Sequence, residues 1–179
     1  MAFFTFAGST AVTTIKDFYR LELRQKGIKL CAYHGLGNML AAAGEAACEG
    51  GYYVDYVPTQ WDTEIPGVKL LRELVKRYRG WDRLDPTYMY GWAGTQVAVE
   101  SISLAIEKVG YDNLSGRAIR DALASMVKND LGGIGIIPPV TMSEEQPYFA
   151  VYLRIYRIQQ GQTIVCSDWL KPVYPTTAG

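Results

Sequence analysis

The sequence has few of the side chains that most often carry metal or redox chemistry. It contains one histidine, His34, and three cysteines, Cys31, Cys48 and Cys166, with no paired short spacing between them. A structural zinc site needs four such ligands at characteristic spacings, so no metal site is predicted. We interpret the cysteines as small buried apolar side chains, although two of them could pair in an oxidising compartment.

Enzyme signatures are also missing. No nucleophile stands beside a base at a spacing that suggests a catalytic pair. Gly35-Leu36-Gly37 provides only GxG and lacks the third glycine of a dinucleotide site. We therefore expect no catalysis and no cofactor.

No charge of one sign dominates. Lys and Arg together number 18, as do Asp and Glu, and no segment concentrates the basic residues, so a nucleic-acid partner is not expected. No run approaches 18 apolar residues, so no transmembrane helix is predicted. The first ten residues lack a cationic region and a long apolar region, and so do not read as a signal peptide.

What the sequence does contain is an alternation of strand and helix patterns. The apolar run Phe3–Phe6 predicts a strand, and apolar residues at helical spacing predict a helix from Ser9 or Thr10, as N-cap, to Gly27. Ile28–Ala32 predicts a second strand. Such β-α-β units build parallel sheets.

The remaining elements follow from turn residues and periodicity. Gly and Pro mark most of their ends. Helices are predicted over 39–47, from Pro66 to Gly80, over 90–108 and after Ser115, and strands over 52–57, 149–155 and 163–166. The last two strands flank a hairpin turn at Gln159–Gln162. The predicted fold class is α/β, with Rossmann-like parallel β-α-β units and a C-terminal β-hairpin.

Several stretches, taken in order, resemble one family. They are FFTFAGSTAVTTIKDFY, GIKLCAYHGLGN with AAAGEAACEGGYYVDYVP, GVKLLRELVKRYRG, DPTYMYGWAGTQVAVESISLAIEKVG, IRDALASM, and GGIGIIPPVTMSEEQPYFAVYLRIYRIQQGQ. Their order resembles the type I periplasmic binding proteins of ABC transporters, specifically the leucine/isoleucine/valine-binding group.

The resemblance implies a partial type I fold, namely the C-terminal portion of a two-lobed protein. Residues 1–57 would belong to the second ligand-binding lobe, 58–148 would return to the first lobe, and 149–179 would lead back to the second. It also implies a periplasmic location and a non-catalytic role. The protein would bind branched-chain amino acids or related small carboxylates, aromatic ones included, for an ABC permease. The alternative is a ligand-sensing receptor or an oligomerisation module of the same fold.

The resemblance also suggests where a ligand would bind. In the second lobe the suggested ligand contacts are the turn at Ser9 and Thr10 and the loop of Tyr33, His34 and Gly35. His34 occupies the position where amino-acid binders of this family carry an acidic residue for the ligand's ammonium group. A histidine suits an amine poorly and, when protonated, favours a carboxylate.

In the first lobe the resemblance points to two aromatic residues, Tyr88 and Trp92, lining the cleft. Each of these ligand-binding assignments has a purely structural alternative. His34 can be a loop residue without a ligand, Ser9 a helix cap, and the aromatic pair ordinary core. Because an incomplete sheet would leave an unpaired edge, we also expect a homo-oligomer.

Overall fold

The computed structural model describes residues 2–4, 8–33, 36–149 and 152–171. The chain folds into two compact units, one formed by Met1–Tyr56 with Tyr152–Gly179 and the other by Val57–Val151. None of the described helices is both long and apolar enough to cross a membrane.

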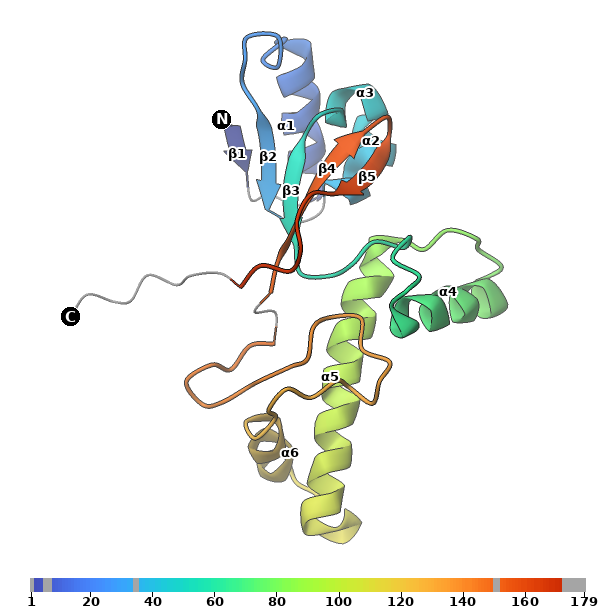
Figure 1. Ribbon diagram of the computed structural model, residues 1–179, viewed down its shortest axis with the longest axis vertical. Helices are drawn as coiled ribbons and strands as arrows, with labels where there is room; N and C mark the ends of the chain where they lie inside the picture. The colour runs from blue at the N-terminus through green and yellow to red at the C-terminus, as the bar shows by residue number, and fades with distance from the viewer. Residues whose placement is uncertain (1, 5–7, 34–35, 150–151, 172–179) are drawn as a thin grey trace, which may run out of the picture. The chain divides into compact units, whose positions relative to one another are not determined.

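Unit 1 is built on a five-stranded sheet, shown in Figure 1. Its strands lie in the order β1 (Ala2–Phe4), β2 (Leu30–Tyr33), β3 (Tyr52–Asp55), β4 (Arg154–Gln159) and β5 (Gln162–Val165). The first three strands are parallel, whereas β4 is antiparallel to both β3 and β5. The α/β class with parallel units and a C-terminal hairpin is therefore confirmed.

The β4–β5 hairpin turns at Gln160 and Gly161, where φ is 51° and 69°. Two consecutive positive φ values are the geometry that matches the right-handed twist of a hairpin, and glycine adopts it without steric cost.

Helices cover one face of this sheet. They are α1 (Gly8–Arg20), α2 (Leu40–Ala43) and α3 (Glu45–Cys48), with the short 3-10 turn η1 (Gly37–Met39) leading into α2. Figure 1 shows them on the same side of the strands. Their apolar residues pack on alternate residues of β2, β3 and β4 in one buried core: Ala11, Ile15, Phe18, Leu30, Ala32, Leu36, Met39, Ala43, Ala47, Cys48, Tyr53, Tyr156 and Ile158.

The opposite face of the sheet has a different character. Register places Cys31, Tyr52, Arg157 and Ile164 in one row across β2–β5, and Tyr33, Val54 and Ile155 in the next. None of these seven side chains is buried. We call this set the open face of the sheet.

The first helix is shorter than the sequence predicted. It ends at Arg20, not at Gly27, and Glu22 has a left-handed φ of 54°. The turns that follow are closed by backbone hydrogen bonds, including Leu23 N–H to the Phe18 carbonyl at 3.2 Å. Leu23 and Ile28 still pack against the core, so apolar residues continue the helical pattern after the helix itself has ended.

Unit 2 consists of helices and turns in its described part. The helices are α4 (Pro66–Arg79), α5 (Pro86–Val109), the 3-10 turn η2 (Tyr111–Asn113) and α6 (Gly116–Leu123). Gly80, with φ at 69°, terminates α4, as predicted. The Asp85 carboxylate accepts from Thr87 N–H at 2.8 Å and so caps α5.

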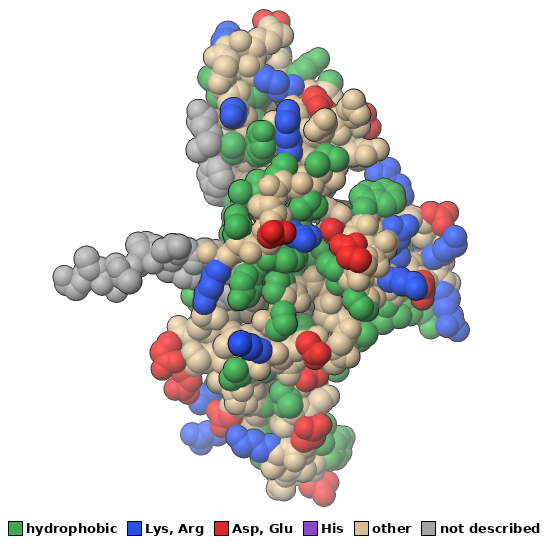
Figure 2. Space-filling model, viewed as in Figure 1, with side chains coloured by type: hydrophobic (Ala, Val, Ile, Leu, Met, Phe, Trp, Pro, Cys, Tyr) green, Lys and Arg blue, Asp and Glu red, His purple; other side chains and the backbone are tan. Residues whose placement is uncertain are grey.

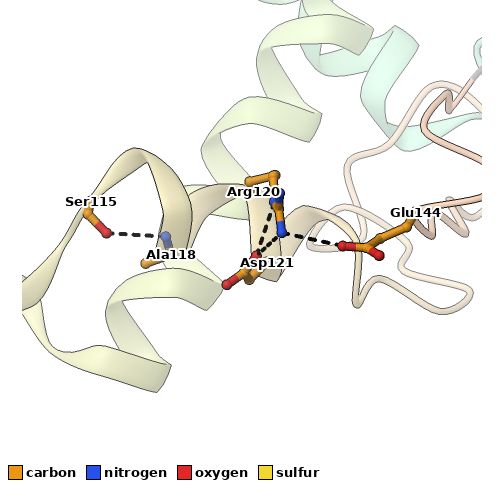
Figure 3. Close-up of polar contacts among 5 residues, drawn as sticks. All are labelled: Ser115, Ala118, Arg120, Asp121 and Glu144. Carbon is orange, nitrogen blue, oxygen red and sulfur yellow. Dashed lines mark hydrogen bonds and ion pairs between the residues drawn. The ribbon is translucent and has the colours of Figure 1, made fainter.

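Helix α6 begins where Ser115 was predicted to cap it. The Ser115 hydroxyl accepts from Ala118 N–H at 3.2 Å, as Figure 3 shows. Arg120 on the same helix pairs with Asp121 at 3.0 Å and with Glu144 at 3.3 Å. The Glu144 contact ties the helix to the turn-rich segment after it.

That segment packs on α5 and α6 through a second core made of Val97, Met126, Leu131, Val140 and Met142. Residues 132–139 form turns, and Asn129 and Val140 on either side of them form an isolated bridge. The strand predicted over 149–155 is β4, which begins later, at Arg154.

Candidate ligand-binding site

The carboxyl ends of β1, β2 and β3 lie at one edge of the unit 1 sheet because the three strands are parallel and adjacent. Open α/β sheets bind ligands at this edge. Helix α1 begins there after β1, Tyr33 ends β2, and Asp55 ends β3, with Tyr56 directly after it. We call Ser9, Thr10, Tyr33, Asp55 and Tyr56 the carboxyl edge.

Ser9 and Thr10 lie in the first turn of α1, which spans Gly8–Arg20. Both are exposed, and among the described residues neither hydroxyl has a hydrogen-bond partner. The capping role is therefore not seen, and both hydroxyls remain available beside the positive end of the helix dipole. An anion such as a carboxylate is stabilised at such a position.

The two threonines one turn later in α1 do make hydrogen bonds with their hydroxyl groups. Thr13 and Thr14 donate their hydroxyl protons to the carbonyls of Ser9 and Thr10, at 3.0 and 2.9 Å. Their hydrogen-bonding capacity is thus partly used within the helix itself.

Two tyrosines and a carboxylate form the electrostatic part of the carboxyl edge. Asp55 is only 5% exposed and its Oδ1 accepts from Tyr56 N–H at 2.8 Å. Burial raises the pKa of Tyr56, and the nearby Asp55 carboxylate and Tyr33 phenol raise it further. The Tyr56 phenol is therefore protonated at neutral pH.

Of the second-lobe residues predicted from the resemblance, Tyr33 is described and is 46% exposed at the end of β2. His34 and Gly35 lie outside the described residues. Asp55 and Tyr56 were not predicted as site residues, yet a signal for them existed. They are polar residues at the carboxyl end of a predicted strand, where open α/β sheets bind ligands.

Tyr88 and Trp92 line a pocket in unit 2. It has a volume of about 320 Å³ and lies between α4 and α5, with Leu71, Thr87, Gly91 and Thr95 as its other lining residues. The family resemblance singled out both aromatic residues. Leu71 is buried, with 5% of its surface exposed. No sequence signal could have shown that Leu71 of α4 faces the start of α5.

Charge and metal-ligating groups add no further site. Figure 2 shows Lys and Arg interspersed with Asp and Glu on the visible face. Across the described residues, no three His, Cys, Asp or Glu side chains are grouped so as to hold a metal ion.

Comparison with known proteins places this geometry in a family. A family model described as periplasmic binding protein matches residues 1–162. The chain belongs to the periplasmic binding protein family. No curated protein matches the sequence.

Solved structures show which fold this family member shares. A branched-chain amino acid ABC transporter protein from Thermus thermophilus, with bound valine, is 19% identical with a TM-score of 0.75, covering 96% of this chain and 46% of the other. A leucine-binding protein from Thermotoga maritima is 16% identical with a TM-score of 0.64, covering 95% and 44%.

A possible leucine/isoleucine/valine-binding protein from Rhodopirellula baltica is also 16% identical, with a TM-score of 0.64 and 85% and 39% of the two chains covered. The chain has part of the type I periplasmic binding protein fold and spans less than half the length of these structures.

Proposed function

We propose that the chain is the C-terminal portion of the substrate-binding component of an ABC transporter. Its solutes would be branched-chain amino acids or related small carboxylates, taken up in the periplasm and passed to an ABC permease without chemical change. Membership of the periplasmic binding protein family supports this proposal. So do solved structures of the same fold described as binding valine or leucine.

The observation that carries the proposal is the carboxyl edge of unit 1. It combines two available hydroxyls in the first turn of a 13-residue helix with phenols at the ends of two neighbouring strands. A carboxylate that meets Ser9, Thr10 and the first backbone N–H groups of α1 would be held by hydrogen bonds and by the helix dipole.

The rest of a solute needs apolar surface. In unit 1 we assign this surface to the ring of Tyr33. Tyr88 and Trp92 of unit 2 are proposed as ligand contacts of their own unit, as the family resemblance implies. His34 and Gly35 complete the proposed ligand-binding set. In this assignment 1–57 belongs to the second lobe, 58–148 to the first, and 149–179 returns to the second.

Because the chain spans less than half of the structures it matches, we expect weak binding by the chain alone. A dissociation constant on the order of 1 mM corresponds to about 4 kcal/mol of binding free energy. A ligand at tenfold that concentration stabilises the folded state by about 1.4 kcal/mol, which a thermal-shift series detects.

The test uses thermal shift with leucine, valine and benzoate on three proteins: the unsubstituted chain, a Ser9→Ala/Thr10→Ala double variant and a Thr13→Ala/Thr14→Ala double variant. Loss of hydrogen bonds to a charged group costs about 1.5–3 kcal/mol, so the first variant should bind tenfold or more weakly. The second variant, changed one turn away, should bind within twofold of the unsubstituted chain. An equal loss of affinity in the two variants, or no change in melting temperature with any ligand, would contradict ligand binding at the carboxyl edge.

A second candidate role is that of a sensing or oligomerisation module, and the open face of the sheet favours association. Parallel sheets in α/β proteins are ordinarily covered on both faces. Here one face presents Tyr33, Val54 and Ile155 unburied, together with Arg157, whose guanidinium lies 5.5 Å from the centre of the Tyr52 ring. We propose a homo-oligomer that uses this face.

A further inference from the structure

The pocket between α4 and α5 is walled by the first three turns of α5 on one side and by Leu71 of α4 on the other. Thr87, Tyr88, Gly91, Trp92 and Thr95 recur at helical spacing, so they form one face of α5. Its volume, about 320 Å³, falls at the small end of the range of ligand pockets.

A glycine keeps this pocket open. Gly91 lies at the centre of the lining face, and a Cβ placed on it would meet no atom within 4 Å. Gly94, one turn further on, also has open space around a Cβ but does not line the pocket. The two glycines therefore offer a matched pair for substitution on one helix.

The lining carries no charged side chain, and much of its polar capacity is already used. The Thr87 hydroxyl donates to the Asp85 carboxylate, and Trp92 Nε1–H donates to the Ile134 carbonyl at 3.4 Å. The Thr95 hydroxyl has no partner among the described residues. What remains for a ligand is the faces of two aromatic rings, an aliphatic side chain and one hydroxyl.

The ring of Tyr88 is also held in place. Trp81 contacts it edge to face, with centroids 6.0 Å apart and planes at 89°. A pre-positioned pair of aromatic faces attracts another ring through offset or edge contacts beyond the effect of burial alone.

We propose that the α4–α5 pocket binds a neutral aromatic ring carrying at most a hydroxyl group. This inference concerns unit 2 alone. It rests on the part of the proposed function that assigns Tyr88 and Trp92 to ligand binding, and it names the chemical class they bind; it does not depend on the carboxyl edge of unit 1. The ring can belong to a free neutral compound or to the apolar part of a larger solute, and both present the same chemistry to the pocket.

Benzyl alcohol is the probe, and saturation-transfer NMR titration is the measurement. Cyclohexylmethanol, similar in size but not aromatic, should bind roughly three- to tenfold more weakly. On the Ser9→Ala/Thr10→Ala variant, which weakens carboxylate binding at the carboxyl edge, benzoate should bind no tighter than benzyl alcohol, because no cationic side chain lines the pocket. Benzoate binding tenfold tighter to that variant, or equal binding of the aliphatic alcohol, would overturn the proposed ligand class.

Substitution tests the location. Gly91→Leu should fill the pocket and weaken benzyl alcohol binding at least tenfold, whereas Gly94→Leu should leave it within twofold. Equal losses in the two variants, or no binding to the unsubstituted protein, would overturn the proposal. Amide shifts of Gly91 and Thr95 in the unsubstituted protein give the same test without a variant, and their absence at saturating probe contradicts the site.

One variant distinguishes probe binding in the α4–α5 pocket from binding at the carboxyl edge. The Ser9→Ala/Thr10→Ala variant should bind benzyl alcohol within twofold of the unsubstituted chain. A tenfold loss in that variant would show that the probe reports on the carboxyl edge and would overturn the assignment to unit 2.

Discussion

Cys48 lies fully buried in the core of unit 1, and its thiol is free. Burial raises its pKa from 9.0 to about 11, against a smaller lowering by Arg24. Below pH 9 the thiol is protonated in both the folded and the unfolded chain and contributes no pH dependence. Between about pH 9 and 11 the unfolded chain ionises first, so folding stability falls as the pH rises.

We therefore expect Cys48 to cost about 2 kcal/mol of stability between pH 8 and pH 10.5. Urea unfolding at the two pH values measures this loss. Cys48→Ala should show a pH-dependent loss smaller by the same amount, whatever its own stability. An identical loss in the two proteins would show that the thiol does not titrate as its burial requires.

Gly67 lies at the start of α4, where a side chain has no room. A Cβ there would collide with the carbonyl oxygen of Ile134 and lie 2.7 Å from Ile136 Cγ2. The same carbonyl accepts from Gln96 Nε2 at 2.6 Å, so it is held in place.

Gly67→Ala should thus destabilise the protein by about 1–3 kcal/mol, the usual cost of overpacking. Gly94→Ala is the matched control. It meets open space in α5 and should stabilise by up to about 1 kcal/mol through helix propensity. Chemical denaturation distinguishes the two variants. A Gly67→Ala variant as stable as the unsubstituted protein would contradict the close contact of residue 67 with Ile134 and Ile136.

At the residue scale, only part of the candidate site could be predicted from the sequence. Tyr88 and Trp92 stood out because of the family resemblance, and the structure brings both to one pocket. Asp55 was missed because a carboxylate at a strand end reads as an ordinary solvated charge, whereas the fold buries it beside Tyr56. Burial of this kind depends on elements that lie far away in the sequence.

At the scale of single elements, helix ends were predicted well where a residue fixes the backbone. Pro66 begins α4 and Gly80 ends it, and Gly110 follows the last residue of α5. Proline and glycine act locally, so the sequence alone reveals them. The end of α1 was wrong because Leu23 and Ile28 continue the apolar pattern from turns.

The start of β4 illustrates the opposite case. Alternating residues begin at Phe149, but strand pairing begins at Arg154, opposite Asp55, the last residue of β3. The length of the partner strand sets this limit. Alternation alone cannot reveal it, because the two-residue period is the same before and after the first pair.

The cap of α6 provides a test at this scale. Ser115→Ala removes the acceptor of Ala118 N–H and should cost about 1 kcal/mol. Glu144→Gln removes only an exposed ion pair with Arg120 and should change stability by less than about 0.5 kcal/mol. Urea unfolding of the two variants should rank them in that order, and the reverse order would contradict the capping geometry.

At the scale of the whole molecule, the open face of the sheet predicts association. Light scattering should find an oligomer at working concentration. Val54→Lys puts a charge on the open face and should shift the protein toward the monomer, whereas Gln25→Lys, exposed in a turn of the same unit, should not. A monomer before any substitution would contradict the proposed homo-oligomer.

The central claim of the proposed function is that the carboxyl edge holds the polar head of a solute. The most direct test is a two-dimensional amide NMR titration of the ¹⁵N-labelled protein with leucine and with benzoate. We predict saturable shifts of the Ser9, Thr10 and Tyr33 amides with at least one of the two ligands. Unchanged amides at these positions under saturating ligand, or shifts confined to other parts of the chain, would contradict the account.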